Sequence, residues 1–202
     1  MTQDYSASRR QMLADLLAGA GALALLPIAD ALASETTVAS GGVRMPVGDV
    51  HDFDIFVGSW RTKQRRLKER LAGSTEWVEF DGTQEFRLLL GGAANMTDNL
   101  LNLPDGPYRG FTLRTFDPAT KRWTIWWLDS RYPHKLDPPL IGRFENGTGA
   151  FYADDTFNGK PIKIRYLWLD VTPTSRRWEQ AFSPDGGKTW ETNWISEFTK
   201  VG

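Results

Sequence analysis

Few side chains in this sequence combine into a pattern that could carry out chemistry. The most promising acid is Asp129, which ends a segment rich in tryptophan and isoleucine. A carboxyl group in partly apolar surroundings can have a raised pKa and act as a general acid or base. An ion pair with Arg131 or Arg143 is the alternative. If the protein is an enzyme, we expect Asp129, Tyr166 and His134 to be its catalytic residues.

Other kinds of catalytic chemistry find little support. The sequence has no cysteine, which excludes disulfides, thiol nucleophiles and cysteine-ligated metals. Its two histidines, His51 and His134, lie outside the strand-like segments described below, so neither is placed to serve as a proximal haem ligand. No Gly-x-Ser-x-Gly motif is present. The sequence therefore predicts no metal site and no cofactor.

Aromatic and amide side chains make a better case for ligand binding. Nine tryptophans in 202 residues suggest either a large aromatic core or an aromatic-lined cavity. Aromatic walls would supply affinity and a few amides would orient the ligand. The alternative is that the tryptophans simply fill the interior. The residues expected to bind a ligand are Gln84, Asn95, Asn99, Trp127, Tyr166, Trp168, Trp178, Gln180 and Trp194.

The elements that would position these side chains are strands. From Phe53 onward, polar and apolar residues alternate in short segments separated by turn sequences such as Asp81-Gly82, Asn146-Gly147 and Asn158-Gly159. The segment 95–99 either brings amides to a ligand or forms a bulged edge strand. About ten strands with hairpin turns predict a single antiparallel up-and-down β-barrel, because closure removes exposed strand edges. The barrel domain is predicted to span residues 51–202, with residues 53–57 as a short helical plug.

The alternation also predicts which side chains face the interior. Charged residues such as Lys63 and Glu197 are expected to face water. Their alternate neighbours, including Gln64, Trp190 and Trp194, are then expected to face inward. The predicted interior is rich in aromatic rings and contains a few amides.

The first 33 residues resemble an export signal. Arg9-Arg10 precede a short apolar stretch from Leu16 to Ile28, and Ala31-Leu32-Ala33 then offers a cleavage site, which together predict a twin-arginine-type signal peptide over residues 1–33. The alternative, an uncleaved membrane anchor, needs a longer apolar run. Residues 34–50 have no periodicity and are expected to form a flexible lead-in. The mature protein is therefore expected in the periplasm or outside the cell, with no stable membrane span after cleavage.

Charge excludes one class of partner. The full chain carries a net charge of −1, and without residues 1–33 its basic and acidic residues balance. A neutral domain has no long-range field that attracts a polyanion, so we do not expect a nucleic acid as a partner. The sequence does not define the oligomeric state.

Two sets of residues carry a resemblance to known families. Gly58-Ser59-Trp60 resembles the Gly-x-Trp signature of lipocalins and their calycin relatives, in which a basic residue packs across the tryptophan; Lys200 is the matching residue here. The segments 123–129, 142–147 and 185–194 resemble the DUF1579 group of uncharacterised bacterial lipocalin-like proteins. The resemblance implies a lipocalin-like barrel and no particular activity.

Three functions follow from this sequence. The first is an exported lipocalin-like protein that binds a small hydrophobic or aromatic molecule in its barrel. The second is a cofactor-independent enzyme of the isomerase, lyase or hydratase type, which uses an acid–base residue in the same cavity. The third is a structural or envelope interaction protein with a filled barrel.

Overall fold

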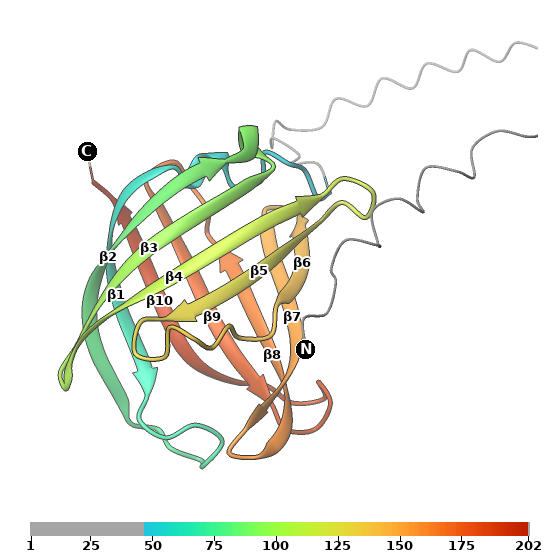
Figure 1. Cartoon of the computed structure of the whole chain (residues 1–202). Coiled ribbons are helices and arrows are strands. Elements are labelled where there is room, and N and C mark those ends of the chain that lie inside the picture. Colours follow the sequence, from blue (N-terminus) through green and yellow to red (C-terminus); the bar gives the residue numbers. More distant parts are fainter. Residues whose placement is uncertain (1–46, 202) are drawn as a thin grey trace, which may run out of the picture. The chain divides into compact units, whose positions relative to one another are not determined.

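The computed structural model describes residues 47–201, which form a closed antiparallel β-barrel of ten strands (Figure 1). Each strand pairs with its neighbours in sequence, and β1 pairs with β10 to close the barrel. The predicted up-and-down barrel is therefore confirmed. The signal predicted over residues 1–33 and most of the predicted lead-in lie outside the described residues.

The elements are η1 (Asp54–Phe56), β1 (Gly58–Leu67), β2 (Trp77–Leu89), η2 (Leu90–Gly92), β3 (Ala94–Leu103), β4 (Gly106–Asp117), β5 (Arg122–Asp129), β6 (Leu140–Glu145), β7 (Thr148–Phe157), β8 (Lys160–Leu169), β9 (Ser175–Ser183) and β10 (Glu191–Lys200). Among residues 47–201, no helix has the length and apolar character needed to cross a membrane.

Two of the predicted hairpin turns form as expected. Asn146-Gly147 joins β6 to β7 and Asn158-Gly159 joins β7 to β8, and all four residues have positive φ angles. Positive φ at both central residues is the requirement of a type I′ turn, which asparagine and glycine satisfy at little steric cost.

The turn predicted at Asp81-Gly82 is wrong, because β2 runs through it without interruption. Gly82 pairs with Thr62 on one side and Leu101 on the other. A β-carbon on Gly82 would lie 2.1 Å from the carbonyl oxygen of Leu100. Glycine is therefore needed here because the neighbouring strand lies too close for a side chain, and not because the chain turns.

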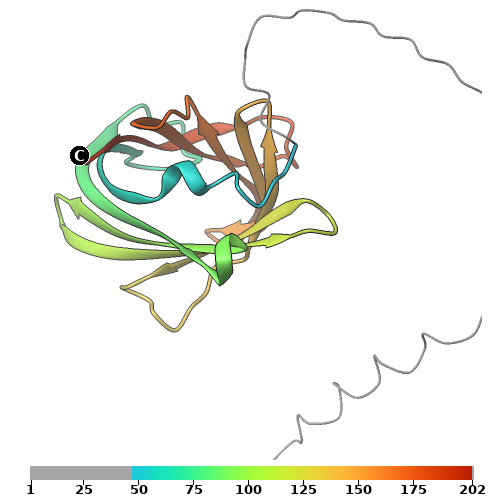
Figure 2. The same cartoon turned by 90° about the horizontal axis from the view of Figure 1, so that it is seen from above.

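The segment before β1 closes one end of the barrel (Figure 2). Phe53 and Phe56 are fully buried there, and Trp60 donates its indole N–H to the carbonyl of Phe56 at 2.7 Å. Lys200 lies 5.5 Å from the Trp60 ring, as the lipocalin resemblance implies. The guanidinium of Arg176 lies closer, 3.6 Å from the same ring. This end is therefore sealed by aromatic rings and two cations.

A bulge between β9 and β10 changes the face of one tryptophan. The register shifts between Thr192 and Trp194, so residues before the shift exchange faces. Trp190 consequently packs against Tyr152, an exposed residue, and under the guanidinium of Arg165. The prediction that Trp190 faces the interior was wrong.

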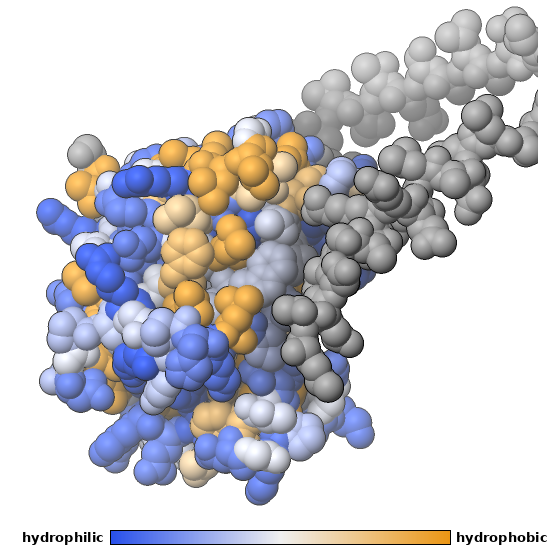
Figure 3. Space-filling view, viewed as in Figure 1, coloured by the Kyte–Doolittle hydropathy of each residue, from blue (hydrophilic) through white to orange (hydrophobic). Residues whose placement is uncertain are grey.

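The outer face of the barrel is polar over most strands but not over β4 and β5. Phe111 and Leu113 of β4, with Trp126 and Leu128 of β5, point outward and are partly exposed. Figure 3 shows apolar side chains gathered on this face. These two strands therefore place apolar groups outside the barrel, and polar groups such as Thr112 and Arg114 inside it.

Candidate functional site

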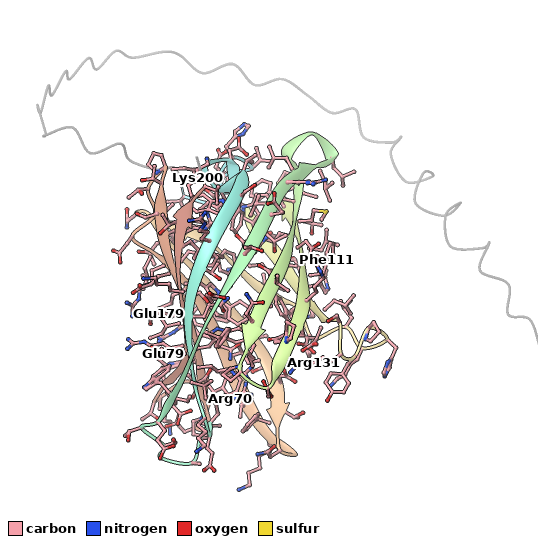
Figure 4. All side chains as sticks on the ribbon, turned by 90° about the vertical axis from the view of Figure 1, so that its left-hand side faces the viewer. Arg70, Glu79, Phe111, Arg131, Glu179 and Lys200 are labelled. Atoms are coloured by element: carbon pink, nitrogen blue, oxygen red, sulfur yellow. The ribbon has the colours of Figure 1, made fainter. Side chains whose placement is uncertain are left out.

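The barrel encloses a cavity of about 240 Å³ to which every strand except β6 contributes side chains. The aromatic plug seals one end. Lys200 lies at that end, whereas Arg70 and Arg131 lie toward the other (Figure 4). A cavity of this size argues against the alternative in which tryptophans fill the whole interior. It lies just below the range of roughly 300–1,000 Å³ that is usual for ligand pockets, which favours a small ligand.

The cavity has two unlike walls. The polar wall is built by side chains from β1 to β4 and from β10, and the apolar wall by side chains from β5 and from β8 to β10. The polar wall contains Thr62, Gln64, Gln84, Asn99, Thr112 and Ser196. The apolar wall contains Ile125, Ile164, Trp168, Trp178, Phe182 and Phe198. A ligand with one polar side and one apolar side would suit this arrangement.

Hydrogen bonds within the polar wall fix its amides. Gln64 accepts bonds from the indole N–H of Trp194 at 2.9 Å and from the hydroxyl of Ser196 at 3.0 Å. Gln84 donates to Asn99 at 2.8 Å, and Asn99 in turn donates to the carbonyl of Gly110 at 2.9 Å. These side chains are therefore held in place before any ligand arrives, which lowers the entropy cost of binding.

The β10 bulge contributes to the site as well. It directs Asn193 into the barrel wall, where this residue is fully buried and accepts a hydrogen bond from Gln180 at 2.8 Å. The side chain of Gln180 therefore has a fixed orientation at the cavity surface.

The structure brings most of the predicted site residues to one place. Nine of them line the cavity: Gln84, Asn99, Trp127, Asp129, Tyr166, Trp168, Trp178, Gln180 and Trp194.

Two predicted residues, Asn95 and His134, do not line the cavity. Asn95 is fully buried and accepts a hydrogen bond from Arg114, so it positions another side chain. His134 is exposed in the loop between β5 and β6. The bulged edge strand considered for residues 95–99 is also wrong, because β3 pairs regularly with β2 and β4.

Asp129 forms the ion pair that was the alternative to an acid–base role. Its carboxylate accepts hydrogen bonds from Arg131, the shortest at 2.6 Å. Burial raises the pKa of Asp129, but the hydrogen bonds from the Arg131 side chain and backbone, with the Arg131 charge, outweigh burial and lower it overall. The expected raised pKa was wrong, and Asp129 stays ionised at neutral pH.

Tyr166 keeps a free hydroxyl in the cavity. Its ring packs edge-on against Trp178, with 4.8 Å between the ring centres. Within residues 47–201, no side chain or backbone group hydrogen-bonds its hydroxyl. Burial raises the pKa of Tyr166 and the carboxylates of Asp137 and Asp155 raise it further, so the phenol is neutral and can donate to a ligand.

Sequence reasoning missed the arginines of the cavity. Arg66, Arg70, Arg114 and Arg131 all line it, although charged residues were expected to face water. Arg131 stacks on Tyr108, 3.8 Å from the ring centre, and Arg70 lies over Phe157 at 5.3 Å. Strict alternation along β1 places Arg66 on the same face as Gln64, which was the available signal.

Metal binding has no support from the described residues. Within residues 47–201, no group of three or more histidine or carboxylate side chains converges. Asp137 and Asp155 both line the cavity, where burial, followed by the charge of Asp155, raises the pKa of Asp137. Two carboxylates without a third ligand do not make a closed metal site.

The N-terminal half of the barrel matches a known protein family. Residues 49–135 match the family described as "Protein of unknown function (DUF1579)". The resemblance seen in the sequence is thereby confirmed over this part of the chain. The match covers β1 to β5, which carry most of the polar wall and Arg114. The apolar-wall residues of β8, β9 and β10 lie beyond it. No curated protein matches the chain.

Solved structures that are similar to this chain are distant from it in sequence. The S-type phycobiliprotein lyase CPES from Guillardia theta aligns with a TM-score of 0.51 and 14% identity, over 74% of this chain and 90% of that one. EF1p2_mFAP2b, solved bound to DFHBI, aligns with a TM-score of 0.41 and 12% identity, over 75% and 98%. A DUF3598 protein of unknown function from Nostoc punctiforme gives 0.42 and 11%, over 78% and 51%. The likeness to the lyase supports the barrel fold alone.

Proposed function

We propose that this protein binds a small organic molecule with an apolar or aromatic body in the barrel cavity. The observation that carries the proposal is the space of about 240 Å³ inside the barrel, which has an apolar and a polar wall. Apolar groups that enter such a space gain roughly 25 cal/mol for each Å² removed from water. The fixed amides and the free Tyr166 hydroxyl orient the polar part of the ligand.

Binding rather than catalysis is the function that the site supports best. The ion pair with Arg131 holds Asp129 as a carboxylate, and the exposed His134 does not line the cavity. Of the three residues expected to act in catalysis, His134 therefore lies away from the cavity, and the lowered pKa of Asp129 makes its carboxylate a weaker base.

A blocked cavity tests the proposal. Thr112 faces the cavity from β4, and the variant Thr112→Phe places an aromatic ring in that space. Thr83→Phe makes the same change on the exposed outer face of β2 and serves as the matched control. Calorimetric titration with naphthalene-2-carboxamide should show binding to the wild type and to Thr83→Phe, with loss of at least tenfold in affinity for Thr112→Phe.

The outcomes separate clearly. Equal affinity of all three proteins would place the ligand outside the cavity and contradict the proposal. Native mass spectrometry of gently purified protein gives an independent measurement: a bound mass that is lost on denaturation, and lost also from Thr112→Phe, supports a resident ligand in this space.

We also propose that the protein works outside the cytoplasm. The proposal is supported by Arg9-Arg10, the apolar stretch and Ala31-Leu32-Ala33, which lie outside the described residues. Cell fractionation followed by mass measurement should find a periplasmic or secreted chain that begins at Ser34. A full-length chain in the cytoplasm would contradict it.

A further inference from the structure

Arg114 is a buried cation that faces the cavity. It lies on β4, is 3% exposed, and stacks near Phe53 and Phe86, at 5.1 and 5.3 Å from their ring centres. Its Nη1 donates to the amide oxygen of Asn95 at 3.1 Å. This is the one hydrogen bond that its guanidinium makes within residues 47–201, and its Nε has no partner there. No carboxylate of the described chain forms an ion pair with it.

The guanidinium of Arg114 remains charged despite its burial. Burial lowers its pKa to about 9, which is still above neutral pH. A buried charge without a counter-ion is costly, because the interior does not replace the water that solvated it. An anion that enters the cavity would supply the missing counter-charge.

A second arginine increases the positive potential at the same end of the barrel. Arg176 is 2% exposed and its Nη2 donates to Gln84, while its Nε and Nη1 have no partner among the described residues. Burial first, and then the charge of Arg114, lower the pKa of Arg176 to about 8. The rings of Trp60 and Phe198 stack against Arg176 at 3.6 and 4.5 Å and stabilise its charge. Arg114 lacks aromatic contacts this close, and of these two arginines it is the one that lines the cavity.

The aspartates of the cavity do not neutralise Arg114. Asp129 is already paired with Arg131, and Asp137 and Asp155 act electrostatically on each other. No aspartate is among the groups that shift the pKa of Arg114, whereas the phenol of Tyr166, which also lines the cavity, is one of them.

Arg114 at the closed end and Tyr166 on the adjoining cavity wall offer donors that match one carboxylate. A guanidinium binds the two oxygens of a carboxylate through parallel N–H groups. The neutral hydroxyl of Tyr166 can donate to the same group from β8. The apolar remainder of the ligand would then lie against Ile125, Ile164 and Trp168.

We propose that the cavity is a site for a small amphipathic carboxylic acid, whose carboxylate binds Arg114 and the hydroxyl of Tyr166. The proposal rests on the proposed function and names the class of ligand.

Two probes of the same shape and different charge test it. Naphthalene-2-carboxylate and naphthalene-2-carboxamide differ at the group that would meet Arg114. Calorimetric titration of the wild type at pH 7 should give at least tenfold tighter binding of the carboxylate. Arg114→Met should remove this preference and leave the affinity for the amide within a few-fold. Arg61→Met, which removes an exposed charge on the outer face of β1, should keep the preference.

A second measurement shows whether Arg114 is retained only for stability. Without ligand, Arg114→Met should unfold at a higher temperature than the wild type, because an apolar side chain replaces an uncompensated buried charge. Naphthalene-2-carboxylate should raise the unfolding temperature of the wild type and of Arg61→Met but not that of Arg114→Met. A lower unfolding temperature for ligand-free Arg114→Met would show that Arg114 stabilises the fold without an anion, and would overturn the proposal.

The two proposals fail in different ways. If the wild type binds the amide and the carboxylate equally, the carboxylate site is overturned and the binding cavity stands. If neither probe binds the wild type at millimolar concentration, both proposals are contradicted. A carboxylate preference that survives in Arg114→Met would place the anion at another arginine and overturn this assignment.

Discussion

Asp52 is a buried acidic side chain, in addition to the buried Arg114 and Arg176. It is 2% exposed, and its Oδ2 accepts bonds from the backbone N–H of Asp49 at 3.0 Å and from the indole N–H of Trp123 at 3.2 Å. Its Oδ1 has no partner within residues 47–201. Burial raises the pKa of Asp52 to about 6, although both hydrogen bonds act in the opposite direction. The residue lies beside the aromatic plug and links it to β5.

The raised pKa makes stability depend on pH. The carboxyl group titrates near 3.8 when exposed and near 6 in the folded chain, so the folded state binds its proton more tightly. The free energy of unfolding contributed by Asp52 therefore rises as pH falls through 6 and levels off below about 4. Between pH 7.5 and pH 5 the wild type should gain about 1.4 kcal/mol from this group. Asp52→Asn, which has no such titration, should lack this gain.

Urea unfolding of both proteins at the two pH values measures the difference. The comparison cancels the titration of other carboxylates, such as Asp185, whose pKa is lowered by hydrogen bonds from Thr189. A wild-type and a variant curve that shift in parallel would show that Asp52 is not the titrating group.

Single residues mark the limits of what the sequence could predict. Alternation and residue type correctly placed Gln84, Gln180 and the tryptophans of the cavity on the inner face. The rule that charged residues face water failed for Arg114, because Phe111 and Leu113 occupy the outer face of the same strand. The local sequence of β4 does not show which of its two faces points inward. The inward orientation of Arg114 is stabilised by its hydrogen bond to Asn95, the residue it pairs with on the neighbouring strand β3.

Strands position the cavity side chains through small residues as well as large ones. Gly110 of β4 lies under the ring of Trp127 of β5, which lines the cavity. A β-carbon on Gly110 would lie 2.0 Å from the Trp127 Cη2 atom. Because Gly110 has no side chain, the indole of Trp127 can pack directly over the backbone of β4.

Gly110→Ala should displace the Trp127 ring. Overpacking of this kind costs roughly 1–3 kcal/mol of unfolding free energy, and the displaced ring should weaken binding of naphthalene-2-carboxamide. Trp127→Leu supplies the control, because the clash disappears without the indole. In a double-mutant cycle measured by urea unfolding, Gly110→Ala should cost much less in the Trp127→Leu background. An equal cost in both backgrounds would attribute the effect to the backbone of β4.

At the level of elements, hairpin chemistry was more predictable than register. An Asn-Gly pair strongly favours a two-residue hairpin turn, so the boundaries between β6, β7 and β8 could be predicted from sequence. Gly82 could be interpreted as a turn because its neighbour in space, Leu100, is distant in sequence. The bulge near Asn193 left no local signal, and it placed Trp190 on the opposite face from the one predicted.

The barrel as a whole is closed unevenly. β1 and β2 share ten paired positions, whereas β5 and β6 share three. The long loop between β5 and β6 carries Arg131 and Asp137, which line the cavity. A single bridge between Leu128 and Leu136 holds part of this loop against β5. The side of the barrel with the fewest backbone bonds therefore lies next to the cavity.

Local opening should begin between β5 and β6, the pair of strands called the seam below. Amides of a strand exchange with solvent through opening events whose cost rises with the number of paired neighbours. Hydrogen exchange followed by mass spectrometry should therefore show faster uptake in peptides covering residues 126–145 than in peptides covering residues 58–67 and 77–89. A ligand that bridges the two walls should slow exchange at the seam most, because it binds the closed barrel in preference to the opened one. Uniform exchange around the barrel, unchanged by ligand, would mean that the closure is even and that ligands enter without opening β5 from β6.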